Sequence, residues 1–533
     1  MGTPNPQPTL ERWQKAIGKT PTLVPGNRVD YLIDGWAAFE AIEQAIESTL
    51  VDNDGSYYIY LAGWYCDLEL PLKAQGKTLD QLFYAASMTF NVQVRIILWD
   101  AIFTADVREQ PGLDQRSINT GAVARVNDLP TGAGILDNNT RWHYVGAHHQ
   151  KLLVVKGSQG LIGLCGGIDV NADRIKADKK TGAPLHDVHC RISGAGALGL
   201  LKVFVDRWLA TPEHVAIDRQ PDDYTRLYRQ IQQTYGTSRP FMPSDQKGPL
   251  LGLKDVLAPA TGKAAGNQYV AIARTFNFVT SGDPCAQEHS IKTSMIGSPQ
   301  QGTLGLIATA MKYIYVEDQY LWNLDAARAI GLALGHLQYV IILISHTDQV
   351  ESIPNPDGGV WAHYNFMKVI ADICREKGYD VRKVKTFHRV VKGTKDLGPN
   401  TYVHAKCWIF DDEVAVIGSA NCNRRGWEAD SEVAAIIYDA PDPGSQTSFA
   451  NSLRCALWQE HLGIAAKELN NWLGANKKWP QNNEDPKKEC SVVYYDMTAK
   501  PPLHPTDVVW DKVDPGDKNL PPCGNRSIVI GGD

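Results

Sequence analysis

The 533-residue sequence predicts an α/β protein built from two copies of one layered unit, each with a largely buried mixed sheet. Two repeated phrases indicate the duplication. YYIYLAGWY at Tyr57–Tyr65 returns as KYIYVEDQY at Lys312–Tyr320, and HHQKLLVV from His148 returns as VHAKCWIF from Val403. Both pairs are separated by 255 residues. Strand-like and helix-like runs also alternate in the same order in each copy, which is typical of layered α/β units.

The first repeat is expected at residues 27–212. It opens with a helix-like period in GWAAFEAIEQAIESTL and continues with the strand YYIYLAG, a helix near Leu79–Phe90 and the buried-strand run VRIILWD. The Gly-, Asn- and Asp-rich stretch Thr104–Arg141 is interpreted as a long connection, of the kind that is often functional. The hairpin KLLVV…LIGLCGG, the segment HDVHCRISG and a helix through Trp208 complete the repeat.

The second repeat, residues 267–473, follows the same order, from the helix QGTLGLIATAM through KYIYVEDQY, YVIILIS and the hairpin KCWIF…VAVIG to DSEVAAIIY. Residues 213–266 are polar and contain Gly and Pro, which predicts a linker with some helix. Residues 1–26 form an N-terminal extension. The tail, residues 474–533, is rich in Pro and Lys with few apolar runs, and we expect it to pack over the two domains.

The composition is that of an ordinary globular protein, with 43% hydrophobic and 21% charged residues. No run approaches the ~18 apolar residues that a membrane helix needs. The net charge of −6 argues against broad electrostatic wrapping of nucleic acid. The ten cysteines form no CxxC pair and have no His partners at zinc spacing, so buried reduced thiols are favoured and no metal or cofactor is expected.

The N-terminus, MGTPNPQPTLERWQ, has no basic start followed by an apolar core, so it is not a conventional signal peptide. Pro6 stands where a myristoylation signal has Ser or Thr. These features are compatible with a cytoplasmic protein, with a processed one, or with export by a route that reads no such peptide. Trp142 and Trp361, in predicted loops, are candidates for contact with a lipid interface, although buried packing is the commoner fate of Trp.

A His and a Lys lie two residues apart at the start of a strand in each repeat. They are His149 and Lys151 in the first repeat, and His404 and Lys406 in the second. Alternate residues of a strand share a face, so each pair presents an imidazole and an ammonium side by side. A single HxK on a strand is usually a half-exposed polar face. Two copies at matched positions favour a functional interpretation.

Each hairpin then returns to small polar residues, Gly166-Gly167-Ile168-Asp169 in the first repeat and Gly418-Ser419-Ala420-Asn421 in the second. A GSxN sequence after a strand is usually only a turn. Next to a His/Lys pair, however, its amide and hydroxyl groups complete a cradle suited to an oxyanion or a phosphate.

These motifs resemble the phospholipase D superfamily. HAKCWIFD followed by GSAN matches its HxK-x4-D-x6-GSxN signature. The segments HHQKLLVV with GGIDV, LHDVHCRISG, YIYVEDQYLW and NRRGWEADSEVA are similar, in order, to motifs of the eukaryotic-like phospholipase D branch. The resemblance covers about residues 27–473 and includes neither the N-terminal extension nor the tail.

The resemblance implies two α-β-α-β-α sandwich domains related by a pseudo-twofold, with one active site at their interface. It implies that one imidazole attacks phosphorus to give a phosphohistidine, while the other protonates the leaving alcohol and then deprotonates the incoming water or alcohol. By analogy His149 is assigned as the nucleophile and His404 as the general acid–base group. The sequence leaves the reverse assignment open.

The same resemblance supplies a set of phosphate-binding residues: Lys151, Lys406, Asn421, Asp169 at the position that matches Asn421, and Ser419 as a support of the cradle. It also places Asp187 and Glu432 on the outer nitrogens of the imidazoles, where a carboxylate fixes the tautomer. From the residues alone, Asp187 reads equally well as a turn residue and Glu432 as a surface charge at the start of a strand.

The first repeat departs from the signature at one position. Asp411 completes the HKD motif of the second repeat, whereas Lys156 stands at that position in the first. The return strand of the first repeat also arrives three residues later. Such an Asp is expected at the hairpin turn, where it braces the motif, and KGSQG is interpreted as a longer turn that replaces it. We expect activity to survive, with a weakened or regulated first repeat left open.

The sequence therefore predicts a phospholipase D that hydrolyses the distal phosphodiester of glycerophospholipids at a membrane surface, with transfer to alcohols as a second outcome. A monomer without a transmembrane segment, cofactor or nucleic-acid partner is expected. The alternatives are a cardiolipin- or phosphatidylserine-synthase-like transferase, a nuclease of the same superfamily, and a non-catalytic lipid-binding scaffold. Bacterial members of the branch include secreted effectors, with which the N-terminus is compatible. Head-group preference and the natural acceptor are not encoded in any motif.

Overall fold

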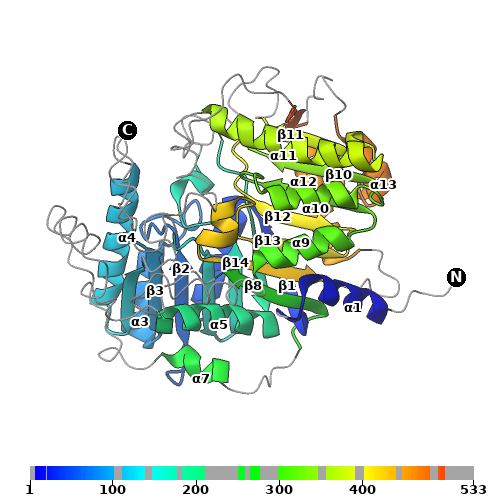
Figure 1. The fold of residues 1–533 in the computed structure, drawn as a ribbon. Helices are drawn as coiled ribbons and strands as arrows, with labels where there is room; N and C mark the ends of the chain where they lie inside the picture. The colour runs from blue at the N-terminus through cyan, green and yellow to red at the C-terminus, as the bar shows by residue number, and fades with distance from the viewer. Residues whose placement is uncertain are drawn as a thin grey trace, which may run out of the picture.

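The computed structural model describes residues 6–19, 21–100, 111–137, 147–176, 183–210, 250–257, 264–275, 298–345, 356–390, 401–439, 447–480 and 490–498. Fifteen strands within these ranges form one continuous mixed sheet, in the order β15-β11-β10-β9-β12-β13-β14-β8-β1-β7-β6-β5-β2-β3-β4. Helices cover both faces of the sheet (Figure 1). The predicted α/β class is confirmed.

The strands of the two repeats match one to one. Those of the first repeat are β1 (Val24–Ile33), β2 (Tyr58–Gly63), β3 (Gln93–Trp99), β4 (Gly132–Asp137), β5 (Leu152–Gly157), β6 (Gly160–Gly166) and β7 (Val188–Ser193). Those of the second are β8 (Gln268–Thr275), β9 (Tyr313–Asp318), β10 (Tyr339–Ile344), β11 (Val384–Arg389), β12 (Lys406–Phe410), β13 (Val414–Gly418) and β14 (Glu432–Tyr438). The order β1-β7-β6-β5-β2-β3-β4 recurs as β8-β14-β13-β12-β9-β10-β11.

The two repeats share one sheet because β1 and β8 pair with each other. The pairing is antiparallel, with Val24 opposite Val270 and Asn27 opposite Gln268. Within each repeat three neighbouring strands are parallel, β2-β3-β4 and β9-β10-β11, and the other strands pair antiparallel. The mixed sheets expected for two separate domains are therefore joined edge to edge.

One face of the sheet is covered by helices of both repeats, each set lying over the strands of its own repeat. The first repeat uses α2 (Asp34–Glu47), α3 (Leu79–Phe90) and α4 (Pro111–Asp128), and the second uses α9 (Pro299–Thr309), α10 (Leu324–Ala333) and α11 (Pro356–Lys377). The opposite face is covered by α5 (Ala195–Ala210), the short α7 (Leu251–Leu257) and α12 (Phe449–Leu462), with α13 (Trp472–Ala475) near the end. Five single-turn helices lie within the described ranges: η1 (Ala172–Arg174), η4 (Val381–Lys383), the π-type η5 (Arg425–Ala429), η6 (Ala466–Glu468) and η7 (Asn476–Lys478).

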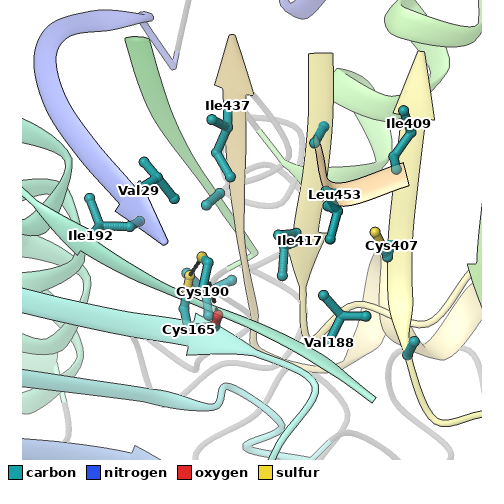
Figure 2. Packing of buried hydrophobic residues seen from close by; sticks show 14 of the residues in the cluster. Val29, Cys165, Val188, Cys190, Ile192, Cys407, Ile409, Ile417, Ile437 and Leu453 are labelled. Atoms are coloured by element: carbon teal, nitrogen blue, oxygen red, sulfur yellow. Dashed lines mark hydrogen bonds between the residues drawn. The ribbon is translucent and has the colours of Figure 1, made fainter. Parts of the chain in front are cut away.

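One hydrophobic core crosses the boundary between the repeats. Figure 2 shows Val29 and Ile192 of the first repeat in the same buried cluster as Ile417, Ile437 and Leu453 of the second. Burying apolar surface of both repeats in one core opposes their separation, at roughly 25 cal/mol for each Å² removed from water. The eight cysteines that the structure describes are buried thiols.

The described parts of the N-terminal extension and of the tail pack on the second repeat. The N-terminal helix α1 (Pro6–Ile17) lies against α9, where a Cβ added at Gly305 would lie 1.8 Å from the carbonyl oxygen of Ala16. In the tail, β15 (Val492–Tyr494) pairs antiparallel with β11 and extends the sheet by one strand. Residues 499–533 lie outside the described residues.

Two local expectations are wrong. Thr104–Arg141, interpreted as a long connection, contains α4 and β4 in its described part. Only a short stripe of α4 is apolar, with Ala122, Val123 and Val126 buried among polar residues. Its hydrophobic periodicity is therefore too weak to predict a helix, and its packing on the sheet stabilises the helix instead. Trp361 lies on α11 and not in a loop, with its ring 5.9 Å from that of Tyr364. Trp142 lies outside the described residues.

The first hairpin also differs from its interpretation as a longer turn. Gly157 pairs with Gly160, so the turn contains two residues, and the later return comes from longer strands. Lys156 meets a carboxylate from the linker: its Nζ lies 2.8 Å from Oδ1 of Asp255 on α7, and the hydroxyl of Tyr58 donates to Oδ2 of Asp255 at 2.7 Å.

The second repeat supplies the carboxylate at the matching position from its own hairpin. Asp411 accepts the backbone N–H groups of Met311, Lys312 and Tyr313 at 2.8, 2.7 and 3.1 Å. Both arrangements fix the hairpin to the start of the neighbouring strand, β2 or β9. The linker helix therefore takes over a bracing role that the first hairpin lacks.

We expect the Lys156–Asp255 pair to contribute measurably to folding. In a double-mutant cycle of Lys156→Ala and Asp255→Ala, denaturant unfolding should give a coupling free energy of about 1 kcal/mol, because both side chains are partly shielded from solvent and Asp255 also accepts from Tyr58. The exposed Arg328–Asp325 pair on α10 is the matched control and should give about 0.3 kcal/mol. Equal coupling in the two cycles would contradict a bracing role.

Candidate active site

The two His/Lys pairs lie at the same edge of the sheet. His149 and Lys151 directly precede β5, and His404 and Lys406 stand at the start of β12. These ends of β5 and β12 adjoin the carboxyl ends of the antiparallel neighbours β2 and β9. In α/β sheets the carboxyl ends of parallel strands are the usual place for ligands.

Short backbone bridges between the repeats bring the pairs together. His148 bridges to Ser431 and His186 bridges to Val403. The N–H of His149 donates to the carbonyl oxygen of Ser431 at 3.1 Å, and the N–H of His404 donates to that of His186 at 2.7 Å. Each catalytic-type histidine is therefore held by the backbone of the other repeat.

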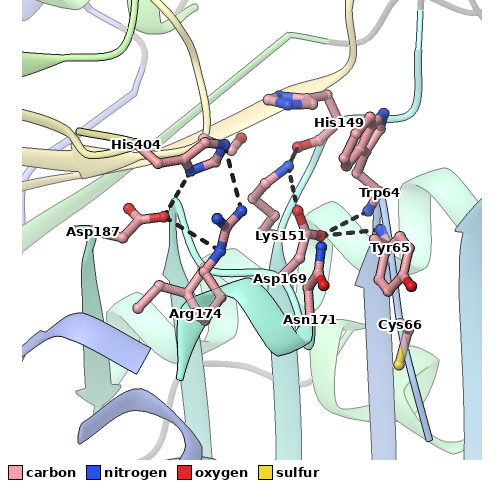
Figure 3. Close-up of polar contacts among 12 residues, drawn as sticks. Trp64, Tyr65, Cys66, His149, Lys151, Asp169, Asn171, Arg174, Asp187 and His404 are labelled. Carbon is pink, nitrogen blue, oxygen red and sulfur yellow. Dashed lines mark hydrogen bonds and ion pairs between the residues drawn. The ribbon is translucent and has the colours of Figure 1, made fainter. Parts of the chain in front are cut away.

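The carboxylates cross the boundary in the same way. Nδ1 of His149 lies 2.8 Å from Oε1 of Glu432. Nδ1 of His404 lies 2.7 Å from Oδ2 of Asp187 (Figure 3). A carboxylate on Nδ1 fixes the ring orientation and favours the tautomer with its lone pair on Nε2. Asp187 approaches so closely that a Cβ added at Gly167 would lie 2.0 Å from its Oδ1, which accounts for a glycine at that position.

The two lysines have different surroundings. Nζ of Lys151 lies 3.1 Å from Oδ2 of Asp169 and 5.6 Å from the centre of the Trp64 ring. Nζ of Lys406 donates to Oε1 of Gln319 at 3.0 Å and to the carbonyl oxygen of His404. Both ammonium groups are buried, so an anion that enters the site meets two weakly screened positive charges.

The residues after β6 and those after β13 make different contacts in the site. Oδ1 of the buried Asn421 has no hydrogen-bond partner among the described residues, which leaves this amide available to a ligand. The hydroxyl of Ser419 donates to Oε2 of Glu432 and so supports that carboxylate. Asp169 accepts the N–H groups of Trp64 and Tyr65 at 3.1 and 3.2 Å, besides its ion pair. Asp411 lies apart from these residues, at the far end of β12.

Comparisons with known proteins agree with this geometry. The family described as "Cardiolipin synthase, PLD-like domain" matches residues 306–453. Phospholipase D alpha 1 of Cynara cardunculus is 24% identical over 531 residues, which cover 77% of this chain and 63% of the relative. Phospholipase D zeta 1 of Arabidopsis thaliana is 22% identical over 620 residues, which cover 84% of this chain and 55% of the relative.

The chain is similar to the phospholipase D superfamily. It spans about three-fifths of the length of the curated relatives that it matches. Among solved structures, the crystal structure of phosphatidylserine synthase from Haemophilus influenzae Rd KW20 superposes with a TM-score of 0.52 at 15% identity, over 80% of this chain and 87% of that chain. At that identity the likeness concerns the fold alone.

Burial and neighbouring cations keep both of these imidazoles neutral. The pKa of His149 is held well below its usual range by burial, and then by Lys151 and Lys406. Burial also lowers the pKa of His404, and Arg174 and Lys406 add to the effect. At neutral pH each ring therefore carries one proton, which Nδ1 donates to its carboxylate.

A second buried network lies behind His404. Glu317 accepts from Nε2 of His186 at 2.9 Å and from Nε2 of His461 at 2.8 Å, and Asp34 accepts from Nδ1 of His186 at 2.8 Å. Burial and Arg389 oppose the charge on His186, but Asp34, Glu317 and Glu460 outweigh them and raise its pKa to about 10. His186, Glu317 and His461 are residue types that hold zinc. In the protonated form that this pKa favours, both ring nitrogens of His186 donate hydrogen bonds, so the three residues form a hydrogen-bonded network.

Sequence reasoning missed three residues that line the site. Trp64 and Gln319 occupy matched positions one residue after β2 and β9, so the 255-residue offset could have identified them as partners of the two lysines. Arg174 lies in the loop after β6, and its Nη2 is 3.4 Å from Nε2 of His404. No repeated motif marks Arg174.

We expect the binding of a phosphate-like anion to weaken as the pH rises. Burial lowers the pKa of Lys406 to about 7, with Lys151 and Arg174 adding to the effect and Asp187 opposing it. Above pH 7 the empty site therefore loses the proton that an anion needs. The affinity for tungstate, whose charge is constant in this range, should fall by up to about tenfold per pH unit between pH 7 and 9.

Calorimetry at pH 8 in two buffers of different ionisation enthalpy measures the proton uptake directly. The native protein should take up protons when tungstate binds, and the Lys406→Met variant should take up fewer. The matched surface variant Lys368→Met should behave like the native protein, because Lys368 lies on the exposed side of α11. A tungstate affinity that is constant from pH 7 to 9 would contradict the assignment.

Proposed function

We propose that the chain is a phospholipase D, which hydrolyses the distal phosphodiester of a glycerophospholipid to phosphatidic acid and a free head group. The observation that supports it best is the crossed pairing of each imidazole with a carboxylate of the other repeat, next to two buried lysines. The names of the curated relatives support the same reaction.

The proposed reaction proceeds in two displacements at phosphorus. When the anionic phosphodiester binds, its charge favours the uptake of a solvent proton on Nε2 of His404. Nε2 of His149 then attacks phosphorus, the bond to the head-group oxygen breaks, and Nε2–H of His404 gives its proton to that oxygen. Water then attacks the phosphohistidine, His404 takes the proton from the water, and phosphatidic acid leaves. Lys151, Lys406 and Asn421 neutralise and orient the phosphate oxygens throughout. An alcohol that replaces water gives the transphosphatidylation product.

The proposed substrate requires contact with a membrane surface. No helix in the described ranges has both the length and the apolar character to cross a bilayer. We therefore propose that the protein meets lipid as a peripheral monomer. The acidic net charge and the lipid-directed names of the relatives favour this substrate over nucleic acid.

The proposal is tested with phosphatidylcholine vesicles by measuring choline release. His149→Ala and His404→Ala should each reduce the rate by at least about 10³-fold, because each removes a group that the chemistry needs in every turnover. His336→Ala, at the end of α10 far from the site, is the matched control and should retain the native rate. Activity of His404→Ala near the native rate would defeat the enzymatic assignment.

Capture by ethanol separates hydrolysis from other reactions of the superfamily. With ethanol present, mass spectrometry should detect phosphatidylethanol formed at the expense of phosphatidic acid, because both arise from one intermediate. A panel of head groups in the same assay measures head-group preference. Phosphodiester cleavage of single-stranded DNA without any lipid turnover would assign the chain to the nucleases of the superfamily.

A further inference from the structure

Arg174 is a buried cation in the active site that the proposed reaction does not use. It ends the single-turn helix η1 in the loop after β6, and 2% of it is exposed. Its Nη2 lies 3.4 Å from Nε2 of His404, and its Nε lies 3.8 Å from Oδ2 of Asp187 (Figure 3). The guanidinium therefore contacts both members of the His404–Asp187 pair.

The backbone holds Arg174 firmly in this place. The N–H of Arg174 donates to the carbonyl oxygen of Asn171 at 3.2 Å. The carbonyl oxygen of Arg174 lies so close to Gly35 that a Cβ added there would be 2.2 Å from it. The N–H of Leu185 donates to the carbonyl oxygen of the preceding residue, Asp173, at 2.9 Å. Because η1 is fixed on both sides, the position of the guanidinium follows from the fold and not from a mobile surface side chain.

A guanidinium next to Nε2 restricts what His404 can do. Arginine only donates hydrogen bonds and stays charged, so it meets the lone pair of Nε2 and leaves the proton on Nδ1, towards Asp187. Burial opposes the charge of Arg174, but Asp173 and Asp187 outweigh it and raise the pKa of the guanidinium. In the empty site the lone pair that His404 would need to attack phosphorus is occupied.

His149 has no equivalent contact. Its Nδ1 bonds to Glu432, and among the described residues no group bonds to its Nε2. The ring of Trp64 lies 5.9 Å from that of His149 at an angle of 68°. The two imidazoles, equivalent by the duplication, thus differ at the atom that would react.

We propose that Arg174 is a positioning residue that divides the two roles: it withholds the Nε2 lone pair of His404, so that His149 becomes the nucleophile and His404 the acid–base group. When the anionic substrate enters, the guanidinium turns towards a phosphate oxygen and releases Nε2, which takes up from solvent the proton that it then gives to the head-group oxygen. The inference rests on the proposed function, and it settles which histidine does which task, a question that the motif leaves open.

The proposal makes the protonation of His404 depend on Arg174. The charged and titratable groups that face His404 are Asp187 before β7, Lys406 on β12, Lys151 before β5, Tyr402, and Arg174 itself. Asp187 favours the imidazolium and the three cations disfavour it. Removal of Arg174 leaves two cations, so the pKa of His404 must rise.

The test compares Arg174→Met and Arg174→Lys with the native protein. Histidine-ring NMR, with the His404 signal assigned from His404→Gln, should show its pKa rising by about one pH unit in Arg174→Met and less in Arg174→Lys, which keeps the charge. Arg191→Gln, which removes a cation of β7 outside the site, is the matched control and should leave the signal unchanged. An unchanged His404 pKa in Arg174→Met would overturn the proposal.

Single-turnover head-group release gives a second readout. His404 acts as the acid in this step, so the rate falls at high pH, and that limb should move to higher pH in Arg174→Met. A purely structural defect would lower the rate at every pH without moving the limb. In the native protein, rapid quenching and peptide mapping should find the phosphoryl group on His149. Its presence on His404 would overturn the assignment.

The two readouts separate this inference from the proposed function. If the native protein releases no head group from any vesicle, the function fails, while the NMR titration still tests the link between Arg174 and His404. If head-group release is normal and the His404 pKa does not respond to Arg174, the function stands and the inference fails.

Discussion

The structure depends on an exchange of carboxylates between two repeats. Glu432 of the second repeat holds His149 of the first, and Asp187 of the first holds His404 of the second. Neither repeat pairs its own motif histidine with one of its own carboxylates, so the site exists only when the repeats are joined. Buried charges tolerate little misplacement, because each unpaired group would cost several kcal/mol. The β1–β8 pairing and the shared core therefore stabilise the fold and also hold the two halves of the site together.

The strand order is the same in the two repeats, but the polar side chains at the strand ends differ. In the first repeat Asp169, after β6, caps the turn that follows β2. In the second, Asp318 at the end of β9 bonds to the N–H of Cys422 after β13 at 3.0 Å, so the carboxylate has changed strands. Gly63 occupies the position in the first repeat that matches Asp318 in the second. Because Asp318 bonds to Cys422, Asn421 does not have to support the turn, and its Oδ1 has no hydrogen-bond partner among the described residues. Duplicated strands have thus kept their order, while the polar groups at their ends have become specialised.

Much of the fold and of the candidate site could be predicted from the sequence because the same pattern of residues occurs in both repeats. A pattern such as His404-x-Lys406 on a strand is ambiguous once, but a matched copy at a fixed offset removes most of the ambiguity. The segment that became α4 carried too little apolar periodicity to be recognised, because its packing on β3 and β4 supplies the stability. The replacement of the first motif Asp by Asp255 was also unpredictable, since 99 residues separate it from Lys156.

The sequence by itself determined the duplication, the α/β class and the four His and Lys residues that a phosphate site requires, because these features are local and periodic. Only the tertiary structure decided which carboxylate meets which imidazole and which buried cation lies against His404. Those contacts join residues more than 200 positions apart. Spacing along the chain carries no information about them, since side chains at strand ends and in loops are brought together by strand order and packing.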